Sequence, residues 1–461
     1  MKSIYLKIVL VICILNFVLR LPFLGMHLNY DEFVYLDGVK QIIENNLNPF
    51  VEFWGYKPPL MFIIPAILSC FIGPNQVIPK LTIYLYSSLI IFFAYLIGRD
   101  IFKNEKVGFW SSLFIFFYPT FMAQSFVFQD PIPTSLFFTM SFYFLYAKRN
   151  KLYILSSILL VMTRELGIIP IGIFLITDII FFKKSIKDAI KIHFPALIVF
   201  SIWMLMNKYY LGWYLWPFNV GLANFRKFFM INFINENIDI LFFQYIPLFL
   251  LFLFCQKYSI YKKLFYVVFI IFTINLLISN SVAAGFRYIF FPIPVLIVMF
   301  IDSVFRIIKN NSFQKTFLKI VLGVMIINHV FILMTARHYL SGDADLRLFK
   351  HINLYSYAIS EAKKVCNDCV YVTNISAMYL SIENYSNSEE KYNQCPLDEE
   401  VEQCLKKYDK NRSKNYVFLL LDNPSVEGYK NKFGLTFYKK INFRNIFGED
   451  EEAFYIYVKY L

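Results

Sequence analysis

Charged residues are scarce in this sequence. Asp, Glu, Lys and Arg make up 17% of the 461 residues, whereas hydrophobic residues make up 58% and aromatic residues 20%. A soluble globular domain carries about 25% charged residues, so this composition excludes an ordinary soluble domain. The hydrophobic residues fill repeated runs from Met1 to about Ala336, and the chain beyond them has an ordinary globular composition.

Acidic residues are sparser in the apolar part of the chain than in the part that follows it. Residues 1–335 contain 28 Lys and Arg against 14 Asp and Glu, whereas the remaining residues contain 17 against 18. The basic excess therefore belongs to loops between apolar runs, where it reports membrane topology and argues against a nucleic-acid partner. No A-x-A-like cleavage site follows the first apolar run, which predicts an uncleaved membrane span.

The apolar runs predict about eleven membrane-spanning helices, since each crossing needs about 20 residues. The expected spans lie near 4–24, 78–98, 107–126, 131–147, 152–163, 166–182, 194–210, 238–255, 264–281, 286–305 and 317–335. With a cytoplasmic N-terminus, 19 of the 28 basic residues fall on the inner side, in agreement with the positive-inside rule.

Two stretches make the number of crossings uncertain. Pro58–Gly73 contains three prolines and is predicted to be a re-entrant or interfacial segment on the outer face. Residues 152–182 are predicted to hold two short spans, because the lysines at 183–191 then fall on the inner side.

The expected fold is therefore mostly α: a polytopic membrane helix bundle over residues 1–335, followed by a small extracytoplasmic α/β domain over residues 340–461. In the second domain a helix is expected at Ile359–Val365. Strands are expected at Val370–Asn374, Tyr416–Leu421, Leu435–Ile441 and Glu452–Val458.

Ionisable residues that interrupt the apolar runs gather on the predicted outer face. Such residues are costly at membrane depth, so each one invites a functional interpretation. They are Asp31 and Glu32 after the first span, Lys57 before a double proline, Asp130 before Pro131, Arg164 and Glu165 between two spans, and Arg287, followed by Tyr288, at the tenth span.

Each of these residues also has a structural alternative. The alternatives are helix capping by Asp31, Glu32 or Asp130, extension of Lys57 to lipid headgroups, mutual neutralisation of Arg164 and Glu165, and headgroup anchoring by Arg287. The functional interpretation is stronger for the group than for any member, because the topology places all of them on one face without having been fitted to them.

The residue types suit transfer of a sugar from a phosphate-linked donor. Such a transfer needs a base that takes the acceptor's proton, a role open to Asp31 and Asp130. It also needs cations that hold the phosphate and stabilise its developing charge. Lys57, Arg164 and Arg287 are of this second kind.

Five short motifs occur in order along the apolar part. They are Asp31-Glu32, Lys57-Pro58-Pro59-Leu60, Asp130, Thr163-Arg164-Glu165-Leu166-Gly167, and Arg287-Tyr288 with Pro292 and Pro294 after it. In these motifs, over about residues 4–335, the sequence resembles the C-type superfamily of integral-membrane glycosyltransferases. It looks closest to the branch of protein O-mannosyltransferases and lipid A aminoarabinose transferases.

This resemblance implies roles for the motif residues. It places the catalytic base on Asp31, with Glu32 and Asp130 in support, and carrier-phosphate binding on Lys57, Arg164 and Arg287 with Tyr288. In some members the second-loop acid helps to hold a metal, so a divalent metal ion at Asp31 and Asp130 is a possible cofactor. The D-x-D and W-W-D-type motifs of oligosaccharyltransferases are absent, which argues against en-bloc transfer of an N-glycan.

The loop Lys208–Asn237 is rich in aromatic residues. Trp213, Tyr214 and Trp216 are expected either to form an interfacial aromatic belt or to contact the acceptor sugar as a lid. Both interpretations stay open.

The cysteines fall into two groups. Cys13, Cys70 and Cys255 lie in apolar runs and are expected to pack there. The tail holds Cys366, Cys369, Cys395 and Cys404, which suit two disulfides better than a zinc site, because the last two do not form a second C-x-x-C.

The sequence therefore predicts a multi-pass membrane glycosyltransferase that takes sugar from a polyprenyl- or dolichyl-phosphate donor on the outer face. Its expected partners are that lipid-linked sugar, membrane lipids, and an acceptor protein, glycan or lipid. The alternative is a transporter or flippase, against which we find no half-and-half internal repeat.

Overall fold

The computed structural model describes the parts of the chain from which the helices and one sheet can be followed. These are residues 4–25, 30–51, 56–72, 77–215, 262–281, 290–334, 361, 364, 370–373, 394–396, 416–421, 436–444 and 450–459. The α-helices are α1 (Ile4–Val18), α2 (Tyr30–Glu44), α3 (Leu60–Ile72), α4 (Val77–Leu96), α5 (Glu105–Phe116), α6 (Pro119–Gln124), α7 (Pro131–Tyr146), α8 (Asn150–Val161), α9 (Ile168–Ile180), α10 (Ile186–Leu211), α15 (Lys262–Ser281), α16 (Ile293–Ile307) and α17 (Asn311–Met334). Short helical turns occupy Leu21–Phe23, Ile97–Ile101 and Glu165–Gly167.

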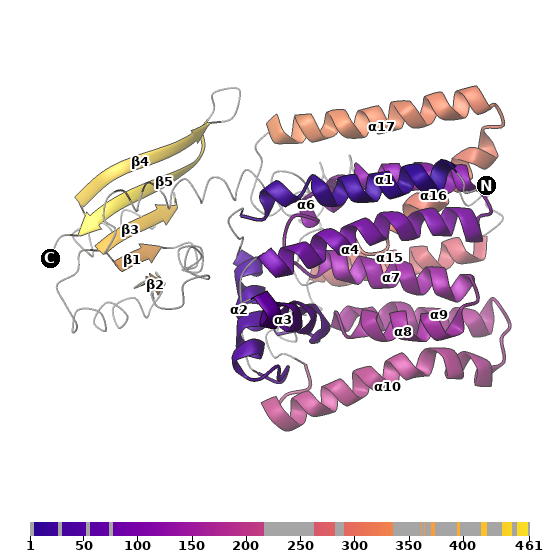
Figure 1. Ribbon diagram of the computed structural model, residues 1–461, viewed down its shortest axis with the longest axis horizontal. Coiled ribbons are helices and arrows are strands. Elements are labelled where there is room, and N and C mark those ends of the chain that lie inside the picture. Colours follow the sequence, from indigo (N-terminus) through magenta and orange to yellow (C-terminus); the bar gives the residue numbers. More distant parts are fainter. Residues whose placement is uncertain are drawn as a thin grey trace.

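Most of the long helices run side by side as a bundle, and α2 lies across one end of it (Figure 1). We call this the α2 end; the N-terminus lies at the opposite end. Prolines at the first turns of α6, α7 and α16 start these helices, because proline is preorganised for a first helical position.

Small and polar residues let neighbouring helices approach each other. A Cβ atom on Gly98 would lie 2.3 Å from the backbone nitrogen of Gly108, so the chain after α4 and helix α5 touch backbone to backbone. The buried side chain of Asn16 donates hydrogen bonds of 2.9 Å to Ser87 and of 2.9 Å to Ser88, which join α1 to α4.

The two helices predicted for residues 152–182 are confirmed as α8 and α9. At the α2 end, Leu60 N donates to Met162 O over 2.9 Å, next to the end of α8. At the opposite end, the ring of Tyr146 in α7 lies 5.8 Å from that of Phe182, which follows α9. The chain therefore reverses direction between α8 and α9.

The stretch Pro58–Gly73 contains the short helix α3, which lies at the α2 end (Figure 1). It has 13 residues with Pro65 inside. A helix of this length spans about 20 Å, less than the roughly 30 Å apolar core of a bilayer. Its place at one end suits the predicted interfacial segment, and its position relative to a membrane stays a prediction.

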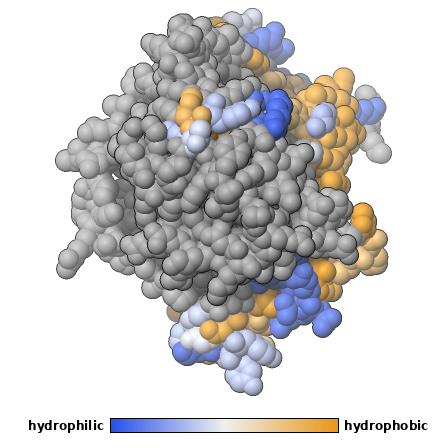
Figure 2. Space-filling view, turned by 90° about the vertical axis from the view of Figure 1, so that its left-hand side faces the viewer, coloured by the Kyte–Doolittle hydropathy of each residue, from blue (hydrophilic) through white to orange (hydrophobic). Residues whose placement is uncertain are grey.

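Within the described residues, three helical stretches are long and apolar enough to cross a membrane: Ile4–Phe23, Val77–Ile101 and Ile186–Leu211. Large apolar side chains also face outward, among them Val11 (62% exposed) and Ile327 (67% exposed). Figure 2, viewed from the sheet side, shows hydrophobic residues along part of the bundle's rim. These features define a membrane protein. The number of crossings stays a prediction, and the expected span 238–255 lies outside the described residues.

The C-terminal part contains a five-stranded mixed sheet in the order β2-β1-β3-β5-β4. The strands are β1 (Val370–Thr373), β2 (Gln394–Pro396), β3 (Tyr416–Leu421), β4 (Thr436–Arg444) and β5 (Asp450–Lys459). β1 pairs in parallel with β2 and β3, whereas β5 pairs antiparallel with β3 and β4. β1, β3, β4 and β5 overlap the four predicted strands, and the sheet lies beyond the α2 end (Figure 1).

The described residues include only part of the helix and of the cysteines predicted for the C-terminal part. Of the helix expected at Ile359–Val365, the two described residues Glu361 and Lys364 are helical. Cys395 lies in β2, whereas Cys366, Cys369 and Cys404 lie outside the described residues. The two disulfides and the domain's side of the membrane stay predictions.

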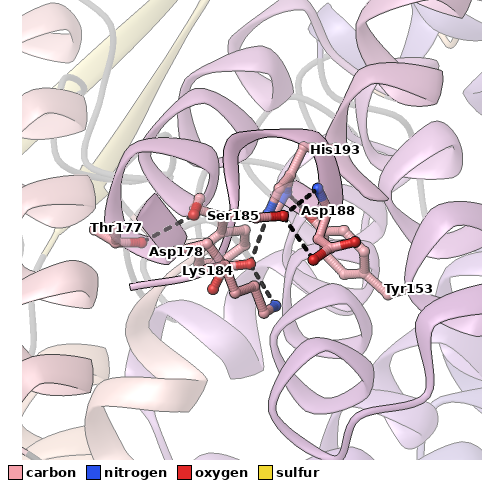
Figure 3. A network of polar contacts seen from close by, with 8 residues as sticks. Tyr153, Thr177, Asp178, Lys184, Ser185, Asp188 and His193 are labelled. Carbon is pink, nitrogen blue, oxygen red and sulfur yellow. Dashed lines mark hydrogen bonds and ion pairs between the residues drawn. The ribbon is translucent and has the colours of Figure 1, made fainter. Parts of the chain in front are cut away.

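A buried polar network joins α8, α9 and α10 at the end opposite α2 (Figure 3). His193, with no exposed surface, bonds through Nδ1 to the Tyr153 hydroxyl over 2.5 Å and through Nε2 to Asp178 Oδ2 over 3.0 Å. The Lys184 ammonium donates to the same carboxylate oxygen over 2.6 Å. One carboxylate therefore anchors both α10 and the turn after α9.

Replacing this carboxylate should destabilise the protein. Asp178→Ala leaves buried His193 without its Nε2 partner, and an unsatisfied buried group costs about 1–3 kcal/mol. We expect a lower thermal midpoint in detergent, read by tryptophan fluorescence. Asp188→Ala is the matched control because Asp188 is exposed and bonds to Ser185; an equal loss in both variants would contradict the anchoring role.

Candidate active site

The buried ion pairs at the α2 end centre on Asp130. Lys57 Nζ lies 3.0 Å and Arg164 Nε lies 3.2 Å from the same atom, Asp130 Oδ2. The three side chains are 9%, 10% and 1% exposed, in the order Lys57, Arg164, Asp130. The structure thus brings together three of the predicted site residues, from segments that lie far apart in the sequence.

Local backbone structure explains how these residues meet. Lys57 directly precedes Pro58 and Pro59, and the backbone bond from Leu60 to Met162 holds its segment against the end of α8. Arg164 follows Met162 by two residues. Its backbone is extended, and it directly precedes the helical turn Glu165–Gly167. Short connections therefore bring the two cations toward each other.

The structural alternatives for these residues do not hold in this arrangement. Asp130 stands at the N-terminus of α7, but its side chain makes no capping hydrogen bond and binds the two cations instead. Lys57 is 8% exposed over the whole residue, and its ammonium group is bound to Tyr35 and Asp130. Arg164 interacts with Glu165 but forms its ion pair with Asp130.

Tyr35 completes the surroundings of Lys57 and was missed by sequence reasoning. The Lys57 ammonium donates a hydrogen bond to the Tyr35 hydroxyl and lies 4.8 Å from the centre of its ring. Tyr35 is 4% exposed and packs edge-on against Phe62 and Phe128. Its spacing of one helical turn from Asp31 would have indicated it, once residues 30–44 were recognised as a helix.

Glu32 connects the first acidic motif to the second. Its carboxylate has no exposed surface and accepts a 2.7 Å hydrogen bond from the backbone nitrogen of Phe128, two residues before Asp130. Asp31 precedes it in the first turn of α2; the structure describes the backbone of Asp31 but not its side chain. Glu32 thereby holds the start of α2 beside the segment that leads to Asp130.

Two further buried cations at the α2 end were not predicted. Lys80, in the first turn of α4, has no exposed surface and interacts electrostatically with Glu32. Arg20, after α1, is 1% exposed, donates over 2.8 Å from Nε to Ser125 Oγ, and lies 4.8 Å from the Phe126 ring centre. The sequence signal that could have indicated them is a basic residue within an apolar run: Arg20 lies near the end of the first run and Lys80 near the start of the second.

The carboxyl of Glu165 faces the same cluster. Burial raises its pKa above the usual range, and the positive charge of Lys57 opposes that shift. A carboxyl group with a raised pKa beside buried cations is typical of a functional site, although structural ion pairs produce the same effect.

The aromatic loop is described as far as residue 215. Trp213 contacts the ring of Tyr56 edge-on at 4.9 Å, and Tyr56 donates to Asn207 Oδ1 over 2.9 Å. Because Tyr56 precedes Lys57, Trp213 lies close to the ion-pair cluster, whereas Tyr214 is 50% exposed. Trp216, Arg287 and Tyr288 lie outside the described residues, so their predicted roles stay predictions.

The described residues offer little support for a metal at Asp130. No group of three or more His, Cys, Asp and Glu side chains that could hold a metal ion occurs among them. Asp130 Oδ2 is held by two cations, which would repel a divalent ion at that oxygen. The donor set at this atom therefore does not fit a metal.

Comparison with known proteins identifies the fold. No protein-family model and no curated protein sequence matches the chain. The structure of ArnT from Cupriavidus metallidurans bound to undecaprenyl phosphate is similar, with a TM-score of 0.62 and 11% identity over 99% of this chain and 98% of that one. Its apo structure gives a TM-score of 0.60 and 10% identity over 98% of each chain.

The archaeal oligosaccharyltransferase AglB from Archaeoglobus fulgidus, in complex with an inhibitory peptide and a dolichol-phosphate, is more distant. Its TM-score is 0.47 at 11% identity, over 98% of this chain and 75% of that one. The chain thus has the fold of ArnT, which matches it over nearly its full length. This fold agrees with the family resemblance that the sequence motifs indicated.

The contact between Glu32 and Phe128 can be tested by two substitutions. Glu32→Gln keeps an oxygen that accepts from the Phe128 nitrogen, whereas Glu32→Leu leaves that buried N–H unsatisfied, at a cost of about 1–3 kcal/mol. We expect the thermal midpoint to fall further for Leu than for Gln. Equal losses in the two variants would show that the negative charge, and not the hydrogen bond, carries the effect.

Proposed function

We propose that this protein is a membrane glycosyltransferase that transfers a sugar from a polyprenyl-phosphate carrier to a protein, glycan or lipid acceptor. The observation that carries the proposal is the buried Lys57–Asp130–Arg164 cluster at the α2 end. The ArnT fold supports it, and ArnT has been seen bound to undecaprenyl phosphate. The proposed site faces the outer side of the membrane.

In this proposal Lys57 and Arg164 hold the carrier phosphate. Arg binds phosphate through a planar fork and Lys through a point charge. As the bond between the anomeric carbon and the carrier oxygen breaks, its electron pair leaves with the phosphate, and both cations stabilise the added negative charge. Arg287 and Tyr288 are proposed to assist.

Asp31 is the proposed base. It takes the acceptor's proton while the acceptor atom forms its bond to the anomeric carbon. Glu32 supports this step by positioning, because its bond to Phe128 holds the start of α2 beside Asp130.

Before the donor binds, the Asp130 carboxylate forms ion pairs with Lys57 and Arg164. A phosphate that binds Lys57 and Arg164 must compete with this carboxylate for the same donors. The phosphate then neutralises Lys57 and Arg164, and the released Asp130 carboxylate has to take up a proton or new hydrogen bonds, since an unpaired buried charge is costly.

Asp31→Asn should abolish most of the transfer. A base contributes about 10²–10⁴ in rate, whereas carrier binding and the thermal midpoint should be retained. Radiolabelled sugar transfer and carrier binding are measured on the same preparation. Asp37→Asn is the matched control on α2, since Asp37 bonds to Gln41; near-normal transfer by Asp31→Asn would show that the base lies elsewhere.

Lys57→Met should weaken binding of polyprenyl phosphate. Loss of one charged hydrogen bond costs about 1.5–3 kcal/mol, which corresponds to about ten- to hundred-fold in affinity. Lys40→Met is the control, because Lys40 is an exposed lysine on α2 paired with Glu44. Unchanged affinity in Lys57→Met, measured by ligand-dependent thermal shift, would contradict the assignment.

Asp130→Asn separates anion exchange from simple positioning. If the carboxylate competes with the phosphate, the variant should bind polyprenyl phosphate as tightly as the wild type or more tightly, while transfer falls. If Asp130 only positions Lys57, binding should weaken instead. Asp302→Asn is the control, since it removes a buried carboxylate that pairs with Arg306 at the opposite end.

A further inference from the structure

The end opposite α2 carries a group of exposed basic residues that the transfer reaction does not use. Lys148 and Arg149 lie in the turn between α7 and α8, Lys183 and Lys187 lie around the turn between α9 and α10, and Lys263 lies in the first turn of α15. We call these five residues, together with Phe182, the basic turn surface.

Contacts between the three segments hold this surface together. The rings of Tyr146 and Phe182 lie 5.8 Å apart, two residues before Lys148 and one before Lys183. Lys263 Nζ donates to Phe181 O over 2.8 Å and lies 6.0 Å from the centre of the Phe182 ring. Phe182, which is 38% exposed, therefore lies beside Lys263 and directly before Lys183 in the sequence.

Two of the lysines occupy a backbone conformation that lysine rarely adopts. Lys148 has φ 58° and Lys183 has φ 52°, in the left-handed region that glycine enters without steric cost. Arg149 N donates to Phe144 O over 2.8 Å, a bond that closes the end of α7 around Lys148. Glycine enters this region without strain, so a change of Lys183 to glycine removes the positive charge and keeps the backbone conformation.

The turn after α9 is anchored from inside the protein. Asp178 accepts from Lys184 Nζ and bonds to His193, which in turn bonds to Tyr153 (Figure 3). A binding surface held in one conformation loses little entropy when its ligand arrives. Lys183 and Lys187 stand on either side of this anchored residue, Lys184.

The acidic residues described next to these turns already have partners: Asp100, which accepts from the Tyr143 hydroxyl close to Arg149, forms an ion pair with Arg99. Asp178 is buried within its own network, and the exposed Asp188 bonds to Ser185. The neighbouring helices expose apolar side chains, among them Ile176 and Ile180 on α9. A partner that fits therefore combines an anionic headgroup with apolar tails.

We propose that the basic turn surface binds the headgroup of an anionic phospholipid. Basic residues at a membrane boundary attract anionic lipids, and the exposed Phe182 lies where acyl chains begin. The lipid's phosphate contacts Lys148, Lys183 and Lys263, and its chains lie along α9. This surface is at the end opposite Asp130, so the proposal does not depend on the transfer function.

The test uses the full-length protein in neutral detergent, titrated with phosphatidylglycerol or with phosphatidylcholine of the same chains. The apparent affinity is read from the shift of the thermal midpoint. A lysine near an anionic surface contributes about 1 kcal/mol, so Lys183→Gly should weaken phosphatidylglycerol binding about five-fold. Phosphatidylcholine should give the same small shift in all proteins.

Two further variants separate charge from backbone. Lys183→Arg keeps the charge and should bind like the wild type. Lys103→Gly is the matched control, because Lys103 has φ 58° but lies in the turn before α5, outside the surface; it should also bind like the wild type. Lys263→Gln removes a charge without touching a left-handed residue and should weaken binding as Lys183→Gly does.

Three results would overturn the proposal. Wild-type affinity in both Lys183→Gly and Lys263→Gln would show that the surface binds no anionic lipid. An equal loss in Lys183→Arg would assign the effect to the backbone. An equal loss in Lys103→Gly would show that general positive charge, and not this surface, attracts the lipid.

Discussion

The carboxylate of Asp130 holds two buried cations that would otherwise have no place inside an apolar bundle. Removing a charge from water is costly, and a buried Lys or Arg is tolerated only where an anion and hydrogen bonds replace its hydration. Lys57 and Arg164 share one oxygen of this carboxylate. This contact joins the segment before α3 and the turn between α8 and α9 to the start of α7.

A second layer of contacts supports the cluster. Glu32 holds the start of α2 to the chain before Asp130, and Tyr35 lies beside the Lys57 ammonium. Trp213 reaches the neighbouring Tyr56 from the end of α10. Polar groups of the opposite end form a separate network around Asp178, which anchors turns and leaves the reaction site untouched. The two polar networks therefore lie at opposite ends of the bundle.

Much of this arrangement could be predicted from the sequence, because ionisable residues stand out in apolar runs. Asp130, Lys57 and Arg164 were predicted to share one face, and the structure joins them directly. The two helices in residues 152–182 followed from the lysines after them. The helical membrane fold followed from the apolar runs, and the family resemblance followed from five motifs, none of which is specific alone.

Other features depend on contacts that no local pattern records. Helix α2 was not predicted, because residues 30–44 lack the long apolar run of a span, and Tyr35 was therefore missed among 33 tyrosines. Lys80 and Arg20 were assigned to predicted spans and not to the site. Glu32 was predicted to be catalytic together with Asp31, and its bond to Phe128 is a contact across 96 positions that sequence spacing does not show.

In the proposed function, the cluster around Asp130 binds the phosphate of a polyprenyl carrier. The most direct measurement compares polyprenyl phosphate with the polyprenyl alcohol of the same chain, each titrated into the purified protein while the thermal midpoint is followed. We expect the thermal midpoint to rise saturably with the phosphate and to change little with the alcohol, because the tails are identical and only the phosphate binds Lys57 and Arg164. Equal shifts with both lipids would contradict it.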